Sequence, residues 1–165
     1  MAQRLALPVL AAIALASGCG GVNTTTKDGR VGDPLNSGGL RVTVLEGDRN
    51  VPRPDNDVTG LSTPRSGMKF VGIKARVCTD RDQAIKAYDF QLDRADGDAV
   101  RPRLPQRSYD DSFDVVRSGC EAGWIVFEIP SDDGAEAVTF NHDDTGSARP
   151  GDTERHARFT WKLEG

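Results

Sequence analysis

The stretch MKFVGIKARVCT, residues 68–79, decides the fold class of this chain. Its apolar side chains recur at every second position, at Val71, Ile73, Ala75 and Val77. Successive side chains of a β-strand point to opposite faces. The alternation therefore predicts a strand with one face in a core and the other toward solvent.

A second strong strand is predicted at Trp124–Ile129. Ile125, Phe127 and Ile129 share one face, and Pro130 ends the pattern because proline cannot donate to a strand ladder. These two segments have the most continuous apolar faces in the chain, so we expect both to be central strands of their sheets.

Shorter strand signals surround these two. They lie at residues 40–46, 86–93, 112–117, 137–141 and 157–163, and a long polar loop fills residues 47–67. The chain has 18 glycines and 9 prolines, and no segment after the N-terminus has a helical period. About seven or eight short strands joined by turns predict an all-β fold, an antiparallel β-sandwich.

The N-terminus has the pattern of an export signal. Arg4 is followed by the apolar run Leu5–Ala16, which is too short to span a bilayer but fits a signal peptide. Ala16, Ser17 and Gly18 then precede Cys19, which resembles the lipobox of bacterial lipoproteins. That resemblance implies that residues 1–18 are removed and that Cys19 carries a diacylglycerol with acyl chains such as palmitate. The alternative is a plain secretory signal that leaves Cys19 as a free thiol.

Residues 19–39 contain few large apolar side chains, three consecutive threonines and several glycines. Such a composition favours a flexible tether between the lipid and the domain. We therefore expect three parts: a signal peptide at 1–18, the lipidated cysteine with its tether at 19–39, and the sandwich at 40–165.

Cys78 and Cys120 remain as a pair once Cys19 is lipidated. In an exported protein an even pair predicts a disulfide. The alternative, a metal site, would need ligands such as His142 and His156, and neither stands at a ligand spacing from a cysteine. Both cysteines are out of phase with the apolar faces of their strands, so we expect the disulfide off the main core.

Several segments resemble a domain-of-unknown-function family found in bacterial lipoproteins and secreted proteins. They are Met68-Lys-Phe-Val-Gly-Ile-Lys-Ala-Arg-Val77, Asp89-Phe-Gln-Leu-Asp93, Gly123-Trp-Ile-Val-Phe-Glu-Ile-Pro130 and Trp161-Lys-Leu163. The family is similar to the immunoglobulin-like domain of a secreted immunoprotective extracellular antigen. The resemblance covers about residues 40–165, implies an immunoglobulin-like sandwich, and implies no catalytic residues.

Charge excludes one class of partner. The mature chain has 20 basic and 25 acidic residues, a net charge of −5, and no basic run. Nucleic-acid binding is therefore not expected. We expect a membrane-anchored module on the extracytoplasmic face of the cell membrane, with an unidentified envelope protein as its partner and no cofactor.

Two other functions stay open at this point: a small-ligand or calcium-binding envelope lipoprotein, and an envelope hydrolase. The acidic segment Asp93-Arg-Ala-Asp96-Gly-Asp98 could bind calcium through clustered carboxylates, although turns also favour Asp and Gly. An envelope hydrolase would need two carboxylates in one cleft. We expect no enzyme, because His142 and His156 are the only histidines and no nucleophile motif accompanies them. Trp124 lies opposite the apolar face of its strand, where we expect another strand to cover it; a contact with a partner is the alternative.

Overall fold

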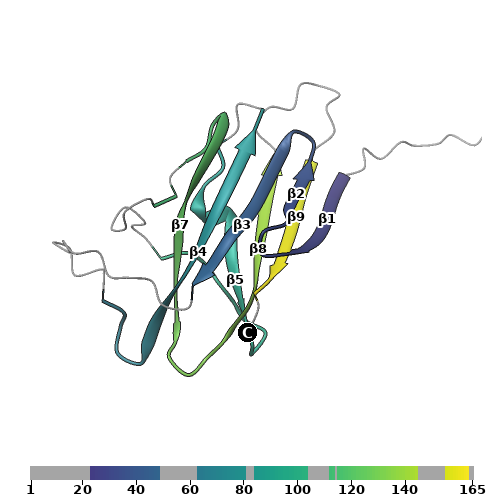
Figure 1. Ribbon diagram of the computed structural model, residues 1–165. Helices are drawn as coiled ribbons and strands as arrows, with labels where there is room; N and C mark the ends of the chain where they lie inside the picture. Colours follow the sequence, from purple (N-terminus) through teal and green to yellow (C-terminus); the bar gives the residue numbers. More distant parts are fainter. Residues whose placement is uncertain are drawn as a thin grey trace, which may run out of the picture.

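A computed structural model describes residues 23–48, 63–80, 84–103, 112–113, 115–144 and 155–163. Over these residues the protein is a sandwich of two β-sheets (Figure 1). Its elements are β1 (Asn23–Arg30), β2 (Pro34–Ser37), β3 (Leu40–Asp48), β4 (Met68–Thr79), a 3-10 turn η1 (Ala87–Asp89), β5 (Phe90–Arg94), β6 (Ala99–Val100), β7 (Gly119–Pro130), β8 (Ala135–Asp144) and β9 (Arg155–Lys162). The predicted β-sandwich is confirmed.

The first sheet has the order β2-β3-β4-β7 and is antiparallel throughout. Its longest pairing joins β4 to β7 along their full lengths, from Met68 opposite Pro130 to Thr79 opposite Gly119. The second sheet has the order β1-β9-β8-β5-β6, and β1 runs parallel to β9. We call them the four-stranded and the five-stranded sheet.

The core lies between the two sheets. The alternating faces predicted for β4 and β7 point into it, and Ile73, Ala75, Ile125 and Phe127 are completely buried. Five of its aromatic side chains form a row of rings with centroids 5.0–6.1 Å apart. This row is Phe113, Phe90, Phe140, Phe159 and Trp161.

The predicted tether is wrong over most of its length. Residues 23–30 form β1 and residues 34–37 form β2, so the domain begins at Asn23 rather than at Leu40. β1 is an edge strand held by its backbone pairing to β9, and such pairing does not require large apolar side chains. The consecutive threonines, Thr24–Thr26, are β-branched and favour a strand.

The expectation that both strong strands are central is right for β4 and wrong for β7. β7 forms one edge of the four-stranded sheet. Part of that edge is covered by the chain before it. The amide of Arg103 donates to the carbonyl of Val126 (2.8 Å), and the amide of Phe113 donates to that of Trp124 (2.9 Å). A covered edge strand therefore has the apolar pattern of a central one.

Two weaker strand predictions also differ from the structure. Residues 87–89 form the turn η1, so Tyr88 is 41% exposed instead of sharing the buried face of Phe90 and Leu92. Among the described residues of 112–117, the structure shows only single bridges at Ser112 and Val116. A short alternating apolar pattern does not form a strand unless a neighbouring strand is available to pair with it.

The strand directions give the sandwich two distinct ends (Figure 1). At one end β1, β3, β7 and β9 begin, and β2, β4 and β8 finish. We call it the disulfide end, because Cys78 and Cys120 lie there. At the opposite end, called the far end, β3 finishes and β7 connects to β8.

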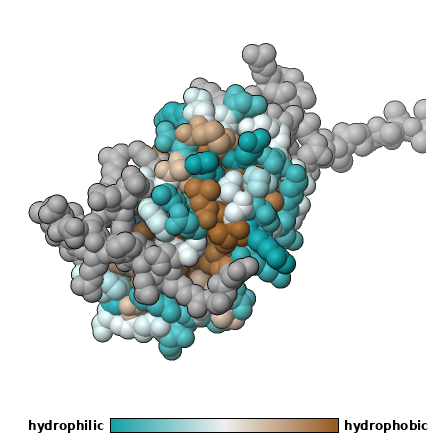
Figure 2. Space-filling model, viewed as in Figure 1, coloured by the Kyte–Doolittle hydropathy of each residue, from teal (hydrophilic) through white to brown (hydrophobic). Residues whose placement is uncertain are grey.

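The surface is mostly polar. Figure 2 shows a short apolar strip near the middle of one face, bordered by hydrophilic residues. Among the described large apolar side chains, Tyr88 and Val115 alone are exposed, at 41% and 36%. No helix in the described part of the chain is long and apolar enough to cross a membrane.

Candidate functional site

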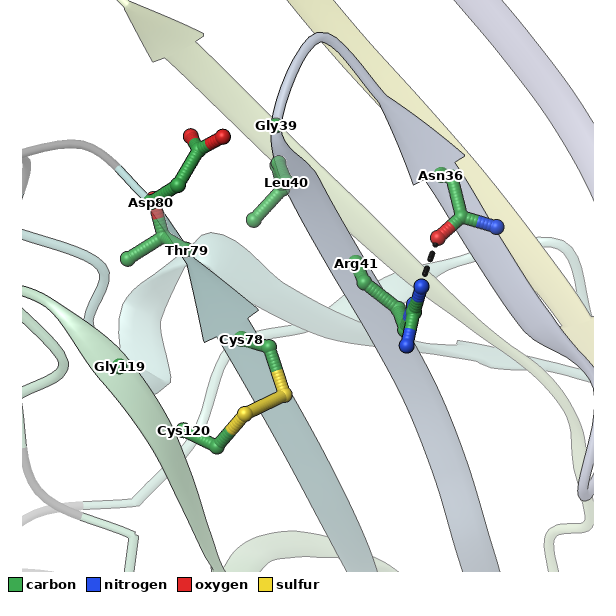
Figure 3. A pocket seen from close by; sticks show the side chains of 9 residues that line it. All are labelled: Asn36, Gly39, Leu40, Arg41, Cys78, Thr79, Asp80, Gly119 and Cys120. Atoms are coloured by element: carbon green, nitrogen blue, oxygen red, sulfur yellow. Dashed lines mark hydrogen bonds between the residues drawn. A yellow bond between two sulfur atoms is a disulfide. The ribbon is translucent and has the colours of Figure 1, made fainter.

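A hollow at the disulfide end is the candidate binding site (Figure 3). Its volume is about 570 Å³. It is formed where β2, β3, β4 and β7 come together, and it is lined by Asn36, Gly39, Leu40, Arg41, Cys78, Thr79, Asp80, Gly119 and Cys120. One cation, one carboxylate, one amide and a disulfide therefore share a single open site.

The two cysteines face each other across neighbouring antiparallel strands. Cys78 is directly opposite Cys120, with Cα atoms 4.0 Å apart, and their sulfur atoms are bonded at 2.09 Å. Neither belongs to the buried core, and Cys120 is exposed. The parity of the two strands thus predicts the location of the disulfide correctly.

Polar groups of the hollow are held by local contacts. Arg41 donates through Nε to Oδ1 of Asn36 at 2.9 Å, which fixes the guanidinium beside the disulfide. Arg41 is also the register partner of Cys78. On the opposite wall, the amide of Asp80 donates to the carbonyl of Gly39 at 3.3 Å.

Gly39 closes the turn between β2 and β3 with a φ of +88°, which L side chains rarely adopt. A Cβ there would lie 2.1 Å from Oδ1 of Asp80. The glycine therefore permits both the turn and the approach of the carboxylate that borders the hollow.

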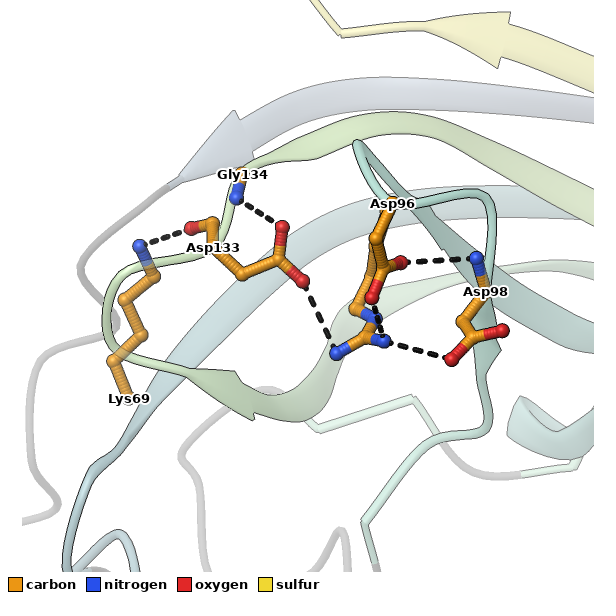
Figure 4. Close-up of polar contacts among 6 residues, drawn as sticks. Lys69, Asp96, Asp98, Asp133 and Gly134 are labelled. Atoms are coloured by element: carbon orange, nitrogen blue, oxygen red, sulfur yellow. Dashed lines mark hydrogen bonds and ion pairs between the residues drawn. The ribbon is translucent and has the colours of Figure 1, made fainter.

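The acidic segment predicted as a calcium alternative lies at the far end. Two of its carboxylates, those of Asp96 and Asp98, and the carboxylate of Asp133 surround a cation of the protein itself, the guanidinium of Arg94 (Figure 4). Arg94 pairs with Asp96, with Asp98 at 3.0 Å and with Asp133 at 3.1 Å. Asp93 lies apart from them, because its Oδ2 accepts a hydrogen bond from Thr139 at 2.6 Å.

This arrangement pairs the acids with a guanidinium of the protein instead of assembling them for a metal. In the described residues no group of three or more metal-ligating side chains is present. Lys69 strengthens the same corner by donating to the carbonyl of Asp133 at 2.5 Å, and the amide of Gly134 donates to its Oδ1 at 2.7 Å. The cluster fastens the turn between β7 and β8 to the turn between β5 and β6.

A buried carboxylate that the sequence reasoning missed is Glu128, on the outer face of β7. Its side chain is 6% exposed and binds two arginines from segments before it. Arg65 donates through its amide (2.7 Å) and its Nε (2.8 Å), and Arg103 forms an ion pair with Oε1. Arg103 also lies over the ring of Phe70, 5.2 Å from its centroid.

Burial on its own would raise the pKa of Glu128, but the other contacts outweigh it. The hydrogen bonds from Arg65 and the positive charges of Arg103 and Arg65 favour the carboxylate. The pKa of Glu128 therefore lies below its ordinary value. Glu and Arg occur throughout this sequence, so no local pattern marks the three as partners.

The two histidines do not come together. The side chain of His142 is 11% exposed and its Nδ1 is 3.4 Å from Oδ2 of Asp89. His156 pairs with Asp143 on the five-stranded sheet. Both imidazole side chains are partly covered. Neither lines the hollow, and neither is near the cysteines as a metal site would require.

Trp124 lies on the outer face of β7, as predicted, and is partly buried. The ammonium of Lys74 is 5.9 Å from the centroid of its ring, and Ser112 forms a bridge with its backbone. Cys19, the predicted lipid site, lies outside the described residues, and its modification stays a prediction.

No protein-family model and no curated protein matches this chain. Among solved structures, it is similar to the secreted protein MPT63 of Mycobacterium tuberculosis, with a TM-score of 0.51 and 18% identity over 82% of this chain and 96% of MPT63. It is also similar to the putative lipoprotein YcdA of Bacillus subtilis, with a TM-score of 0.55 and 13% identity. That match covers 83% of this chain and 39% of YcdA. The predicted resemblance to secreted β-sandwich proteins is thus confirmed at the level of the fold, and membership of a domain-of-unknown-function family stays a prediction.

Proposed function

We propose that this chain is an extracytoplasmic lipoprotein, held on the membrane by diacylglycerol on Cys19, which presents its sandwich as a non-enzymatic binding module. The observation that carries the proposal is the bond between Cys78 and Cys120. Disulfides persist in oxidising compartments, which supports export. With these two cysteines paired, Cys19 is the one remaining cysteine of the chain, and it directly follows the small residues of the signal.

The named neighbours support the same location. MPT63 is a secreted protein and YcdA is described as a putative lipoprotein. Two acyl chains on one cysteine would give stable attachment, whereas a single chain of myristoyl length gives only marginal binding.

The geometry of the hollow supports binding over hydrolysis. A hydrolase with two acidic groups needs both carboxyl groups in one cleft, roughly 5–9.5 Å apart. Asp80 is the single carboxylate among the residues that line the hollow, and the acids at the far end are paired with Arg94. Arg41 and Asn36 can instead donate hydrogen bonds to an acidic or amide-bearing ligand.

The anchor is tested by intact-mass analysis of protein extracted from the membranes of the native host, beside a Cys19→Ser variant. We expect the native protein to begin at Cys19, to carry the added mass of a diacylglycerol, and to lack the two hydrogens lost in the disulfide. The variant should leave the membrane fraction. A native mass without lipid would contradict the proposal.

The binding role is tested by crosslinking on intact cells. We expect a discrete envelope protein to be captured by the native chain, and Trp124→Ala to reduce that capture at unchanged melting temperature. Tyr88→Ala is the matched control, because Tyr88 is an exposed aromatic on the turn η1 and not on β7. Absence of any captured protein would count against the module.

A further inference from the structure

The distance between the anchor and the domain is short. β1 begins at Asn23, four residues after Cys19, and it is fixed along its length by pairing to β9. Four residues span at most about 14 Å even when fully extended. A lipid on Cys19 therefore keeps the start of β1 within about that distance of the bilayer surface.

The start of β1 belongs to the disulfide end. Asn23 is paired with Arg155, which in turn is paired with Asp144 at the finish of β8. On the four-stranded sheet, the same end is formed by Leu40 opposite Thr79, where β3 begins and β4 finishes. Figure 1 shows these strand ends on one side of the sandwich.

The far end is distant from this point. β4 has 12 residues, so its 11 steps of about 3.3 Å separate the two ends by about 36 Å. This separation is more than twice the roughly 14 Å that the four-residue link between Cys19 and Asn23 can span. The far end can approach the membrane only if the domain lies on its side.

The outer face of the five-stranded sheet, to which β1 belongs, offers little net attraction for lipid. On the outer face of the five-stranded sheet, three basic and three acidic side chains are described. They are Arg30, Arg158, Lys162, Asp28, Asp93 and Asp143. Each basic residue near an anionic surface contributes about 1 kcal/mol, and acids on the same face oppose it. The exposed side chains Tyr88 and Val115 are too few to insert a whole face into the bilayer.

From this geometry we propose that the sandwich stands end-on, with the disulfide end and its hollow against the lipid headgroups. The proposal rests on lipid at Cys19, as in the proposed function. The hollow with Arg41 and Asp80 then opens at the headgroup layer. The turns that hold Arg94 are directed away from the membrane, where they can meet a partner in the envelope.

The test is paramagnetic relaxation measured by NMR on the chain that begins at Cys19. The protein is held on nanodiscs of phosphatidylcholine and phosphatidylglycerol that contain a headgroup-spin-labelled lipid. One sample carries the native lipid. In a second sample, a maleimide phospholipid is coupled to Cys19. The maleimide reacts with Cys19 alone, because Cys78 and Cys120 are bonded to each other.

We expect the amides of residues 38–41, 78–80 and 118–120 to relax faster than those of 95–98 and 131–134. The difference should be about tenfold or more, because paramagnetic relaxation falls with the sixth power of distance and the ends are about 36 Å apart. Equal relaxation at both ends, or relaxation along the whole outer face of either sheet, would overturn the end-on arrangement.

A matched variant carries 20 Gly and Ser residues inserted between Val22 and Asn23. Its link has a root-mean-square length of about 25 Å, which should remove most of the difference between the ends. The same difference with the long link would show that adhesion, and not the short link, orients the domain, and would overturn the inference. A native sample without lipid would refute the proposed function, while the maleimide sample would still decide the orientation.

Discussion

Removal of the disulfide is the sharpest test of how this domain is stabilised. Replacement of Cys78 and Cys120 together by serine opens a loop with a sequence separation of 42 residues. In the chain-entropy model, a loop of this length stabilises the folded state by about 4 kcal/mol at 25 °C, because the bond limits the unfolded chain.

The position of the disulfide separates this entropic contribution from losses of core packing. Both cysteines lie outside the buried core, and Cys120 is exposed. Their replacement therefore creates no core cavity, for which a further loss would be expected. The backbone pairing of β4 with β7 also remains available to the variant. Engineered and native disulfides often contribute less than the model value, so we expect a loss of about 2–4 kcal/mol.

The measurement is urea unfolding of the native chain and of the double variant, followed by tryptophan fluorescence. We expect a lower midpoint and a larger m value, because the unfolded variant exposes more surface without the cross-link. In a thermal scan, the same loss corresponds to about 6–16 °C for a domain of this size. The native chain under reducing conditions serves as the control and should match the variant.

Two results would refute this reasoning. A loss below about 1 kcal/mol with an unchanged m value would show that the bond does not limit the unfolded chain. A loss above about 6 kcal/mol would mean that the disulfide also fixes the native ends of β4 and β7, so that the entropic account is insufficient.

Two further substitutions test local contacts. Glu128→Gln should cost about 2–3 kcal/mol at neutral pH, because two arginines lose a buried carboxylate. The lowered pKa of Glu128 means that its stabilising effect is present above the ordinary value of 4.5 and is lost as the pH falls through the folded-state value. Unfolding curves of both proteins should therefore converge in acid, and a difference that does not change with pH would contradict the ion-pair account. Gly39→Ala should cost about 1–3 kcal/mol through its positive φ and the contact with Asp80. Gly97→Ala is its control, because Gly97 has a similar φ of +89° and open space around it, and equal losses would show that the Asp80 contact does not matter.

The strand periodicity of β4 and β7 predicts the sandwich because both strands bury one continuous apolar face. It also predicts the place of the disulfide, since Cys78 and Cys120 are out of phase with those faces. The same reasoning fails for β1, whose pairing to β9 uses backbone groups. The amino-acid composition of a segment indicates whether its side chains are buried in a core. An edge strand such as β1 can form with few buried side chains, so its composition does not reveal it.

The contacts of Glu128 and Arg94 could not have been predicted from the sequence. Arg65 is 63 residues from Glu128, and Asp133 is far from Arg94 in the chain. Only the folded arrangement of the turns brings these charges together. For the same reason the hollow beside the disulfide could not be predicted, because it combines residues from four strands.

The parallel pairing of β1 with β9 has a mechanical consequence. If Cys19 is anchored as proposed and a partner pulls at the far end, tension would act along β1 from Asn23. The ladder runs from Asn23 to Arg30 and lies parallel to that pull, so its hydrogen bonds share the load in shear. They cannot open one after another like a zipper. The strand nearest the proposed anchor is thus attached in a geometry that resists force.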